Sequence, residues 1–156
     1  TLQQSSAASD VYKRQQSEDL NLFSTKNFKI VSKRKPTSKQ LKNLIFAFNV
    51  CRYVKSNAIV LASNETTVGI GSGQPSRLDS CQIAINKMKK FNLQNDNLVA
   101  ASDAFFPFVD GIEKLVQSGV RAVVQPSGSI RDKEIINFAN ETDTVLVFSK
   151  TRHFRH

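Results

Sequence analysis

Two aspartates, Asp103 and Asp110, flank a short segment, residues 104–108, that holds three phenylalanines and a proline. Aromatic rings offer flat faces to a planar ligand, and carboxylates accept hydrogen bonds from N–H groups or bind a cation. A loop of this composition is therefore a candidate binding site. The same residues also fit a loop whose rings enter the core and whose aspartates cap a turn and a helix. This stretch alone leaves both interpretations open.

Arg77 follows a glycine-rich segment, residues 69–73, and lies in the first turn of a helix that we expect to begin near Ser76. Free backbone N–H groups, the helix dipole and a guanidinium together favour a phosphate at such a place. The glycine spacing is neither the dinucleotide fingerprint nor a P-loop. A tight turn beside an exposed arginine explains the same residues. The alternating glycines also fit close approach of the backbone to a ligand or to another strand.

The two cysteines, Cys51 and Cys81, do not have the spacing of a zinc site, and the chain has no Pro-Cys-x-x-Cys or His-x-Glu motif. We expect buried thiols in a reducing compartment and no zinc. Both histidines, His153 and His156, lie in a cationic C-terminal segment, residues 152–156. Alone, such a segment is more typical of surface than of a site.

The length of 156 residues suits one domain or a piece of a larger protein, and no apolar run is long enough to cross a membrane. The net charge of +9 is uneven. Residues 1–60 hold 11 basic and 3 acidic side chains, a net of +8 by subtraction, and residues 61–156 hold 11 and 10, a net of +1. The basic run at residues 33–35 fits a solvated face or a polyanion contact, although no aromatic residues are interleaved with it.

Hydrophobic periodicity predicts the elements that position these residues. The predicted strands cover residues 28–32, 58–62, 66–71, 98–101, 120–125 and 144–149, and the predicted helices cover residues 37–55, 76–91, 112–118 and 131–140. From residue 58 onward this order predicts an α/β fold with a mixed, largely parallel sheet and helices on both faces. Because ligands gather at the carboxyl ends of such strands, we expect the loops that begin at Asp103, Pro126 and Ser149 to converge.

Five motifs then occur in order, at residues 55–59, 69–77, 102–108, 125–132 and 152–156. Together they closely resemble the C-terminal end of the AICAR transformylase domain of the AICAR transformylase/IMP cyclohydrolase family, from about Asn27 to the last residue. The resemblance implies a cytidine-deaminase-like, three-layer α-β-α fold. It makes residues 37–156 the second of two such subdomains and residues 16–36 a connecting segment. Residues 1–15 are polar and rich in Ser and Gln, so we expect a non-native or disordered leader.

The resemblance implies a multifunctional, cytoplasmic, homodimeric enzyme of purine biosynthesis. Its transformylase moves a formyl group from 10-formyltetrahydrofolate to AICAR, and its second activity, IMP cyclohydrolase, is a hydrolase. The family's catalytic Lys-His pair belongs to the first subdomain and has no counterpart in this chain. We therefore expect this piece alone to be inactive.

The family's site residues carry over to matching positions. Asn57 is a catalytic residue and an AICAR contact, and as a neutral donor it stabilises charge without taking a proton. The other implied AICAR contacts are Arg77, Phe105 and Arg152. The implied folate contacts are Leu78, Pro107, Phe108 and Asp110. A potassium ion would take ligands from Asp103, Val54, Ser56, His153 and Arg155.

Two other interpretations remain. A nonenzymatic nucleic-acid-binding module would use the basic run and would bind with a steep salt dependence. A zinc deaminase on the same scaffold would need ligands that the sequence lacks. The family resemblance favours AICAR and reduced folate as partners, with neither nucleic acid nor a membrane.

Overall fold

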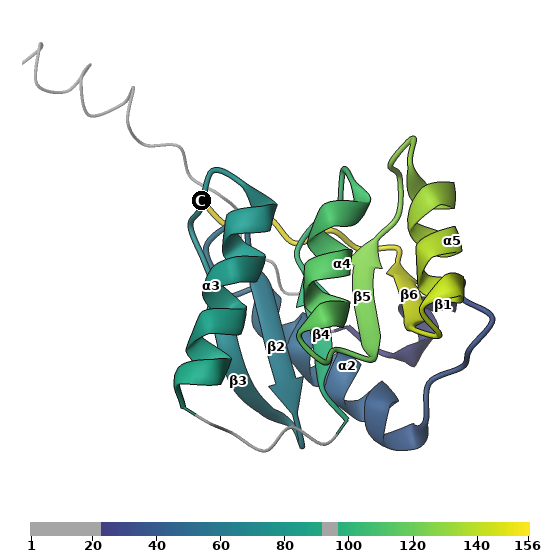
Figure 1. The fold of residues 1–156 in the computed structure, drawn as a ribbon, viewed down its shortest axis with the longest axis horizontal. Helices are drawn as coiled ribbons and strands as arrows, with labels where there is room; N and C mark the ends of the chain where they lie inside the picture. The colour runs from purple at the N-terminus through teal and green to yellow at the C-terminus, as the bar shows by residue number, and fades with distance from the viewer. Residues whose placement is uncertain (1–22, 92–96) are drawn as a thin grey trace, which may run out of the picture.

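The computed structural model describes residues 23–91 and 97–156, and the predicted leader, residues 1–15, lies outside them. A six-stranded sheet forms the middle of the molecule, in the order β1-β6-β5-β4-β2-β3 (Figure 1). The strands are β1 Phe28–Ile30, β2 Ile59–Ser63, β3 Thr66–Gly71, β4 Val99–Ser102, β5 Ala122–Pro126 and β6 Val145–Ser149. The helices are the short 3₁₀ helix η1 Thr25–Asn27 and the α-helices α2 Ser38–Cys51, α3 Arg77–Lys90, α4 Val109–Gln117 and α5 Asp132–Glu141. The predicted strands and helices are thus confirmed, within a few residues at their ends.

The sheet is mixed, as predicted, but its parallel part is smaller than expected. β4, β5 and β6 run parallel, whereas β1 pairs antiparallel with β6, and β2 pairs antiparallel with both β3 and β4. The two-residue turn at Asn64 and Glu65 makes β2 and β3 a hairpin, in which the strands must be antiparallel. The crossover through α3 sets β4 parallel to β3, but β2 lies between them. Both neighbours of β2 therefore run against it.

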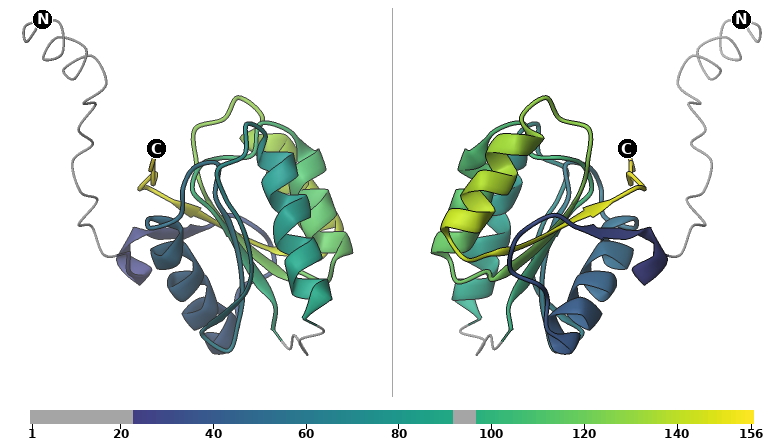
Figure 2. Two further views of the ribbon diagram at one scale, coloured as in Figure 1. Left: turned by 90° about the vertical axis from the view of Figure 1, so that its left-hand side faces the viewer. Right: turned by 90° about the vertical axis from the view of Figure 1, so that its right-hand side faces the viewer.

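Helices cover both faces of the sheet, which confirms the three-layer α-β-α arrangement (Figure 2). Successive strand residues point to opposite faces. In β2, Ile59 and Leu61 pack in the core that α3, α4 and α5 cover. Val60 and Ala62 pack in the core beneath α2. The strands are buried on both faces, which explains why they read as continuous apolar runs.

The helix α2 begins where the sequence predicts. The Thr37 side chain accepts from the Gln40 N–H at 3.2 Å, and the Gln40 side chain accepts from the Thr37 N–H at 3.0 Å, which makes a capping box. The helix ends at Cys51, one turn before the predicted end. Gly119 follows α4 with φ of 103°, the left-handed conformation expected of a residue that ends a helix.

The glycines of β3 serve helix packing rather than a ligand or another strand. A Cβ atom at Gly69 would lie 2.2 Å from the Ala84 carbonyl oxygen, and one at Gly71 would lie 1.9 Å from the Ser80 carbonyl oxygen. Both carbonyls belong to α3. The two glycines therefore let the backbone of α3 approach the strand closely and hold the helix start beside the end of the sheet.

The helix α4 begins at Val109, three residues before the predicted start, so that Asp110 and Gly111 are helical. The sequence predicted a start at residue 112, which left Gly111 in the loop before the helix. A Cβ atom there would lie 2.7 Å from the Phe106 ring. Gly111 is thus required because a buried ring packs on the helix, and the Asp110 carboxylate accepts from the Gly111 N–H at 2.7 Å in the first turn.

Candidate functional site

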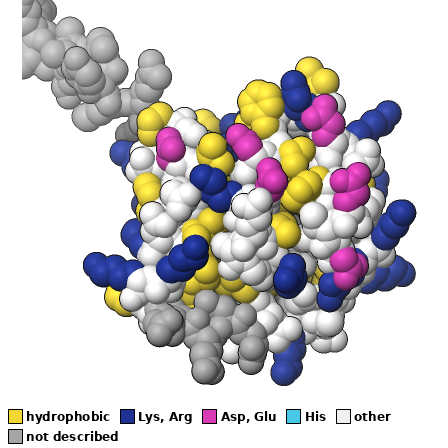
Figure 3. Space-filling view, in the orientation of Figure 1, with side chains coloured by type: hydrophobic (Ala, Val, Ile, Leu, Met, Phe, Trp, Pro, Cys, Tyr) yellow, Lys and Arg dark blue, Asp and Glu magenta, His cyan; other side chains and the backbone are white. Residues whose placement is uncertain are grey.

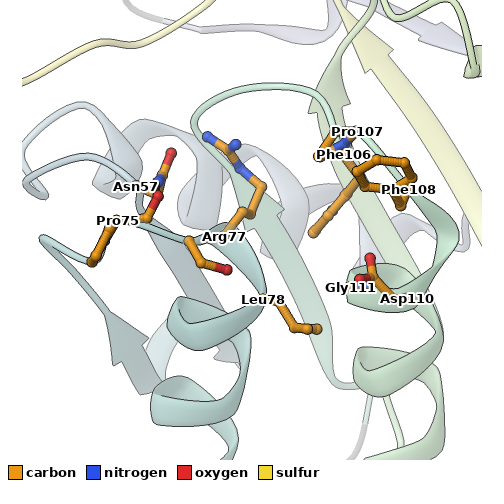
Figure 4. Close-up of a pocket in the computed structure, with 10 residues that line it drawn as sticks. Asn57, Pro75, Arg77, Leu78, Phe106, Pro107, Phe108, Asp110 and Gly111 are labelled. Atoms are coloured by element: carbon orange, nitrogen blue, oxygen red, sulfur yellow. Dashed lines mark hydrogen bonds between the residues drawn. The ribbon is translucent and has the colours of Figure 1, made fainter.

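A pocket of about 420 Å³ opens beside the start of β2, between the first turns of α3 and α4 (Figure 4). Its lining is Asn57, Pro75, Ser76, Arg77, Leu78, Phe106, Pro107, Phe108, Asp110 and Gly111. Six predicted site residues lie there together: Asn57, Arg77, Leu78, Pro107, Phe108 and Asp110. Figure 3 shows exposed apolar side chains close to acidic ones at this end of the molecule.

Strand pairing explains why distant residues meet here. Ile59, the first residue of β2, pairs with Ser102, the last residue of β4. The start of β2 therefore lies at the carboxyl end of the parallel strands, where ligands gather. Hydrogen bonds draw the following loops together as expected, since the His153 N–H donates to the Asp103 carbonyl at 3.1 Å and the Ser127 N–H to the Ser149 carbonyl at 3.4 Å.

Asn57 is held by its own amide group. Its Nδ2 donates to the carbonyl oxygens of Gln74, at 2.9 Å, and Pro75, at 3.1 Å. Its backbone carbonyl accepts from the Ser80 hydroxyl at 2.8 Å, and the peptide bond between Ser56 and Asn57 is cis. Because carbonyl oxygens only accept, the amide nitrogen must face them. Both N–H groups are then used within the protein, and Oδ1 is left as an acceptor, whereas the sequence suggested a donor.

Arg77 carries a charge that the protein already balances. Its Nη2 lies 2.8 Å from Asp103 Oδ1, and its Nε donates to the Ser102 hydroxyl oxygen at 3.0 Å. The Arg77 side chain is 12% exposed and that of Asp103 is 1% exposed. A buried carboxylate beside the guanidinium weakens the attraction of this site for a phosphate. The N–H groups of Nη1 have no partner among the described residues and suit a neutral acceptor.

The three phenylalanines of the aromatic loop have different places. Phe106 is buried, lines the pocket, and donates its N–H to Gln125 Oε1 at 3.5 Å. Phe108 is 51% exposed, and the Arg131 guanidinium lies 4.8 Å from its ring centroid. Phe105 is half-buried and does not line the pocket. One ring thus enters the core, as one interpretation of this loop expects, and the exposed Phe108 ring leaves the binding-site interpretation a prediction.

The residues proposed for potassium converge at the edge of this site. The Ser56 hydroxyl donates to Asp103 Oδ2 at 2.6 Å, and the Ser56 N–H donates to the Arg155 carbonyl at 2.8 Å. The Arg155 N–H returns a bond to the Ser56 hydroxyl at 3.2 Å. His153 is buried, with its ring centroid 4.4 Å from that of Phe48. The Asp103 carboxylate and the Arg155 carbonyl oxygen thus both contact Ser56, and Val54 lies two residues before it in the sequence.

Arg152 is exposed, and its guanidinium lies 4.8 Å from the Phe154 ring centroid. It does not line the pocket. The neighbouring His153 N–H reaches the Asp103 carbonyl, so the terminal segment runs along the same edge of the sheet. Arg152 makes no ion pair with any residue in the two described ranges.

The basic run at residues 33–35 makes hydrogen bonds and an ion pair at the protein surface. Arg34 pairs with Asp143 at 2.5 Å, and the Lys33 N–H donates to the Asn140 side chain at 2.7 Å. These contacts are exposed and place the run beside the end of α5. One of its three charges is thus already paired, which fits a solvated face.

The cysteines are buried, as expected. Burial raises the pKa of the Cys51 thiol well above its usual value and that of Cys81 to about 12. Neither thiol is ionised at neutral pH. No group of three or more His, Cys, Asp or Glu side chains that could hold a metal ion occurs within residues 23–91 and 97–156. Over the same residues, none of the helices has the length and apolar character needed to cross a bilayer.

The sequence did not indicate the buried polar residues that hydrogen-bond the residues of the pocket. Ser102 and Ser80 are fully buried serines whose hydroxyls bond Arg77 and the Asn57 carbonyl. Gln125 is also fully buried and holds the backbone of Phe106. Polar residues at the end of a buried strand or on the inner face of a helix are the signal that marks such positions. Their partners follow only from the fold.

Comparison with known proteins identifies the family. The model of the AICARFT/IMPCHase bienzyme family matches residues 5–87, which is more than half of the chain. The chain belongs to this family. The chain is also similar to the bifunctional purine biosynthesis protein PurH of Persephonella marina, to which it is 46% identical over 141 residues. The alignment covers 90% of this chain and 27% of that relative, so the chain spans about a quarter of its length.

A solved structure is also similar, namely a diaminohydroxyphosphoribosylaminopyrimidine deaminase/5-amino-6-(5-phosphoribosylamino)uracil reductase from Thermotoga maritima. The TM-score is 0.41 at 12% identity, over 70% of this chain and 34% of that one. A likeness of this size carries no argument about function.

Proposed function

We propose that this chain supplies the second-subdomain half of an AICAR transformylase active site, where formyl transfer from 10-formyltetrahydrofolate to AICAR takes place. The observation that supports the proposal is the pocket in which Asn57 and Arg77 face the aromatic loop. We call the part of the lining with Asn57 and Arg77 the polar wall and the part with Phe106, Pro107 and Phe108 the apolar wall (Figure 4). Such a lining could receive two ligands side by side, one held by hydrogen bonds and the other by stacking.

The polar wall suits the AICAR base. The aromatic amine of AICAR is a poor nucleophile, since its lone pair is delocalised into the ring, so the enzyme must orient it against the formyl carbon. Asn57 Oδ1 would accept an N–H of the amine or carboxamide. The Arg77 Nη1 group would donate to the carboxamide oxygen, a neutral acceptor that its balanced charge favours. Arg152, exposed and without an ion pair in the described part of the chain, would meet the phosphate.

The apolar wall suits the folate. Phe108 presents an exposed ring, and Leu78 and Pro107 line the pocket beside it. The Asp110 carboxylate is exposed at the start of α4 and would accept from the amino and ring N–H groups of the pterin. Phe105, which the family resemblance places against the imidazole, would have to turn toward the ligand.

The oxygen atoms near Ser56 would suit a potassium ion as ligands. Carbonyl oxygens with one carboxylate are ligands that a large monovalent cation accepts. Asp103, Val54, Ser56, His153 and Arg155 would hold it. A bound potassium ion would hold the terminal segment, residues 152–156, in place and with it Arg152.

The proton transfers of the reaction would belong to the Lys-His pair of the missing subdomain, which acts as acid and base. The chain alone would therefore bind but not turn over. The complete protein would be a cytoplasmic homodimer.

The test is calorimetric titration of the chain with AICAR, and separately with a reduced folate, in potassium buffer. Arg77→Ala is expected to abolish AICAR binding, and Asp110→Asn to weaken folate binding about tenfold by removing a charged acceptor. Arg121→Ala, an exposed arginine outside the pocket lining, is the matched control. Near-ultraviolet circular dichroism establishes that each variant is folded. If a folded wild-type chain binds neither ligand, the proposed half-site is refuted for this chain by itself.

A further inference from the structure

We propose that Ser102 is a positioning residue that sets the orientation of the Arg77 guanidinium in the pocket. Ser102 is the last residue of β4 and is fully buried, so it touches no ligand. Its hydroxyl oxygen lies 3.0 Å from Arg77 Nε. The proposed role is therefore exerted through Arg77.

The hydrogen-bond polarity of the hydroxyl is determined by its other partner. Ser102 Oγ lies 2.6 Å from the Ala104 carbonyl oxygen, which can only accept. The single hydroxyl proton must therefore point to Ala104. A lone pair is then turned toward Arg77, and the Nε–H group, which can only donate, completes the bond.

Asp103 supplies the second fixed point. Its Oδ1 accepts from Arg77 Nη2 at 2.8 Å, and its Oδ2 is held by the Ser56 hydroxyl at 2.6 Å. The guanidinium is planar, so bonds at Nε and Nη2 define its plane and its rotation. The charge pair alone would permit the group to swing about the Nη2 contact. Ser102 removes that freedom and directs the Nη1 edge, the one without a protein partner in the described residues, to the ligand.

A direct readout is the Arg77 Nε–H signal in ¹⁵N–¹H correlation spectra of the full chain, assigned by its loss in Arg77→Lys. We expect slow solvent exchange of this proton in the wild type. Ser102→Ala removes one oxygen atom and is expected to speed exchange about tenfold or more, the effect of losing a charge-assisted hydrogen bond.

Ser32→Ala is the matched control. The Ser32 hydroxyl also donates to a carbonyl two residues on, that of Arg34 at 2.7 Å, and accepts an N–H, that of Leu146 at 2.8 Å. Ser32 packs beside β6 and contacts no pocket residue in these bonds. Exchange at Arg77 is expected to stay within twofold of wild type in this variant. Unchanged exchange in Ser102→Ala, or an equal increase in both variants, would overturn the proposal.

The consequence for the ligand rests on the proposed function and is measured separately. The dissociation constant of AICAR is expected to rise about tenfold in Ser102→Ala and to stay within twofold in Ser32→Ala. Arg77→Lys keeps the charge beside Asp103 but lacks the planar guanidinium that bonds through both Nε and Nη2, so it is expected to weaken binding similarly. This variant replaces Ser102→Ala in the binding measurement if Ser102→Ala does not fold. A wild-type chain that does not bind AICAR but shows the exchange effect would refute the proposed function and support the role of Ser102. Faster exchange with unchanged affinity would refute the role in binding.

Discussion

Replacing Asp103 with asparagine should destabilise the protein severely, because it removes one half of a buried ion pair. The Arg77 side chain is 12% exposed and would keep its charge, with the Ser102 hydroxyl and at most a neutral amide oxygen at position 103 as acceptors and no negative charge beside it. Leaving a buried charge without its partner costs about 3–5 kcal/mol. A domain of this size is stable by about 5–15 kcal/mol, so the loss is a large share of the total.

The assay is equilibrium unfolding in urea, followed by circular dichroism, for Asp103→Asn, Arg77→Met and the double variant. Arg77→Met leaves the Asp103 carboxylate with the Ser56 hydroxyl as its remaining side-chain partner, so it should cost a similar amount. The double variant contains no uncompensated charge. Its loss in the free energy of unfolding should be smaller than the sum of the single losses by about 2 kcal/mol or more.

The exposed pair Arg34–Asp143 is the matched control. Its N–O distance is 2.5 Å, shorter than the 2.8 Å of the buried pair, but its side chains are 40% and 77% exposed. Arg34→Met should cost less than about 1 kcal/mol, because solvent screens the charges. The reasoning fails if Asp103→Asn costs as little as Arg34→Met, or if the two changes at the buried pair are additive.

Three further predictions concern the frame of the site. Gly71→Ala would place a Cβ atom 1.9 Å from the Ser80 carbonyl oxygen, so unfolding experiments should show a loss of at least about 2 kcal/mol as α3 is displaced. Thr37→Ala removes half of a capping box and should cost about 1 kcal/mol, whereas the same change at the exposed Ser38 should cost little. Burial raises the pKa of Cys81 from 9.0 to about 12, so the stability that the neutral thiol contributes is complete below about pH 9. It falls by up to about 1.4 kcal/mol per pH unit as the pH rises toward 12, and Cys81→Ala should flatten the measured pH dependence there.

The sequence alone determined the elements, and their ends to within a few residues, because the signals for these are local. Apolar periodicity marked the strands and helices, Thr37 and Ser76 marked the starts of α2 and α3, and Gly119 marked the end of α4. Side-chain spacing and capping chemistry act over a few residues, so they can be read along the chain. The family resemblance also named six of the residues that line the pocket.

Only the tertiary structure decided which chemical groups those residues present. Asn57 keeps its N–H groups for Gln74 and Pro75 because β2 pairs with β3, and Arg77 meets Asp103 because β2 also pairs with β4. These contacts join residues that are 17 to 26 positions apart, and no local pattern encodes them. The physical reason is that a polar side chain has several possible partners until folding buries it, and burial then requires that one set be satisfied.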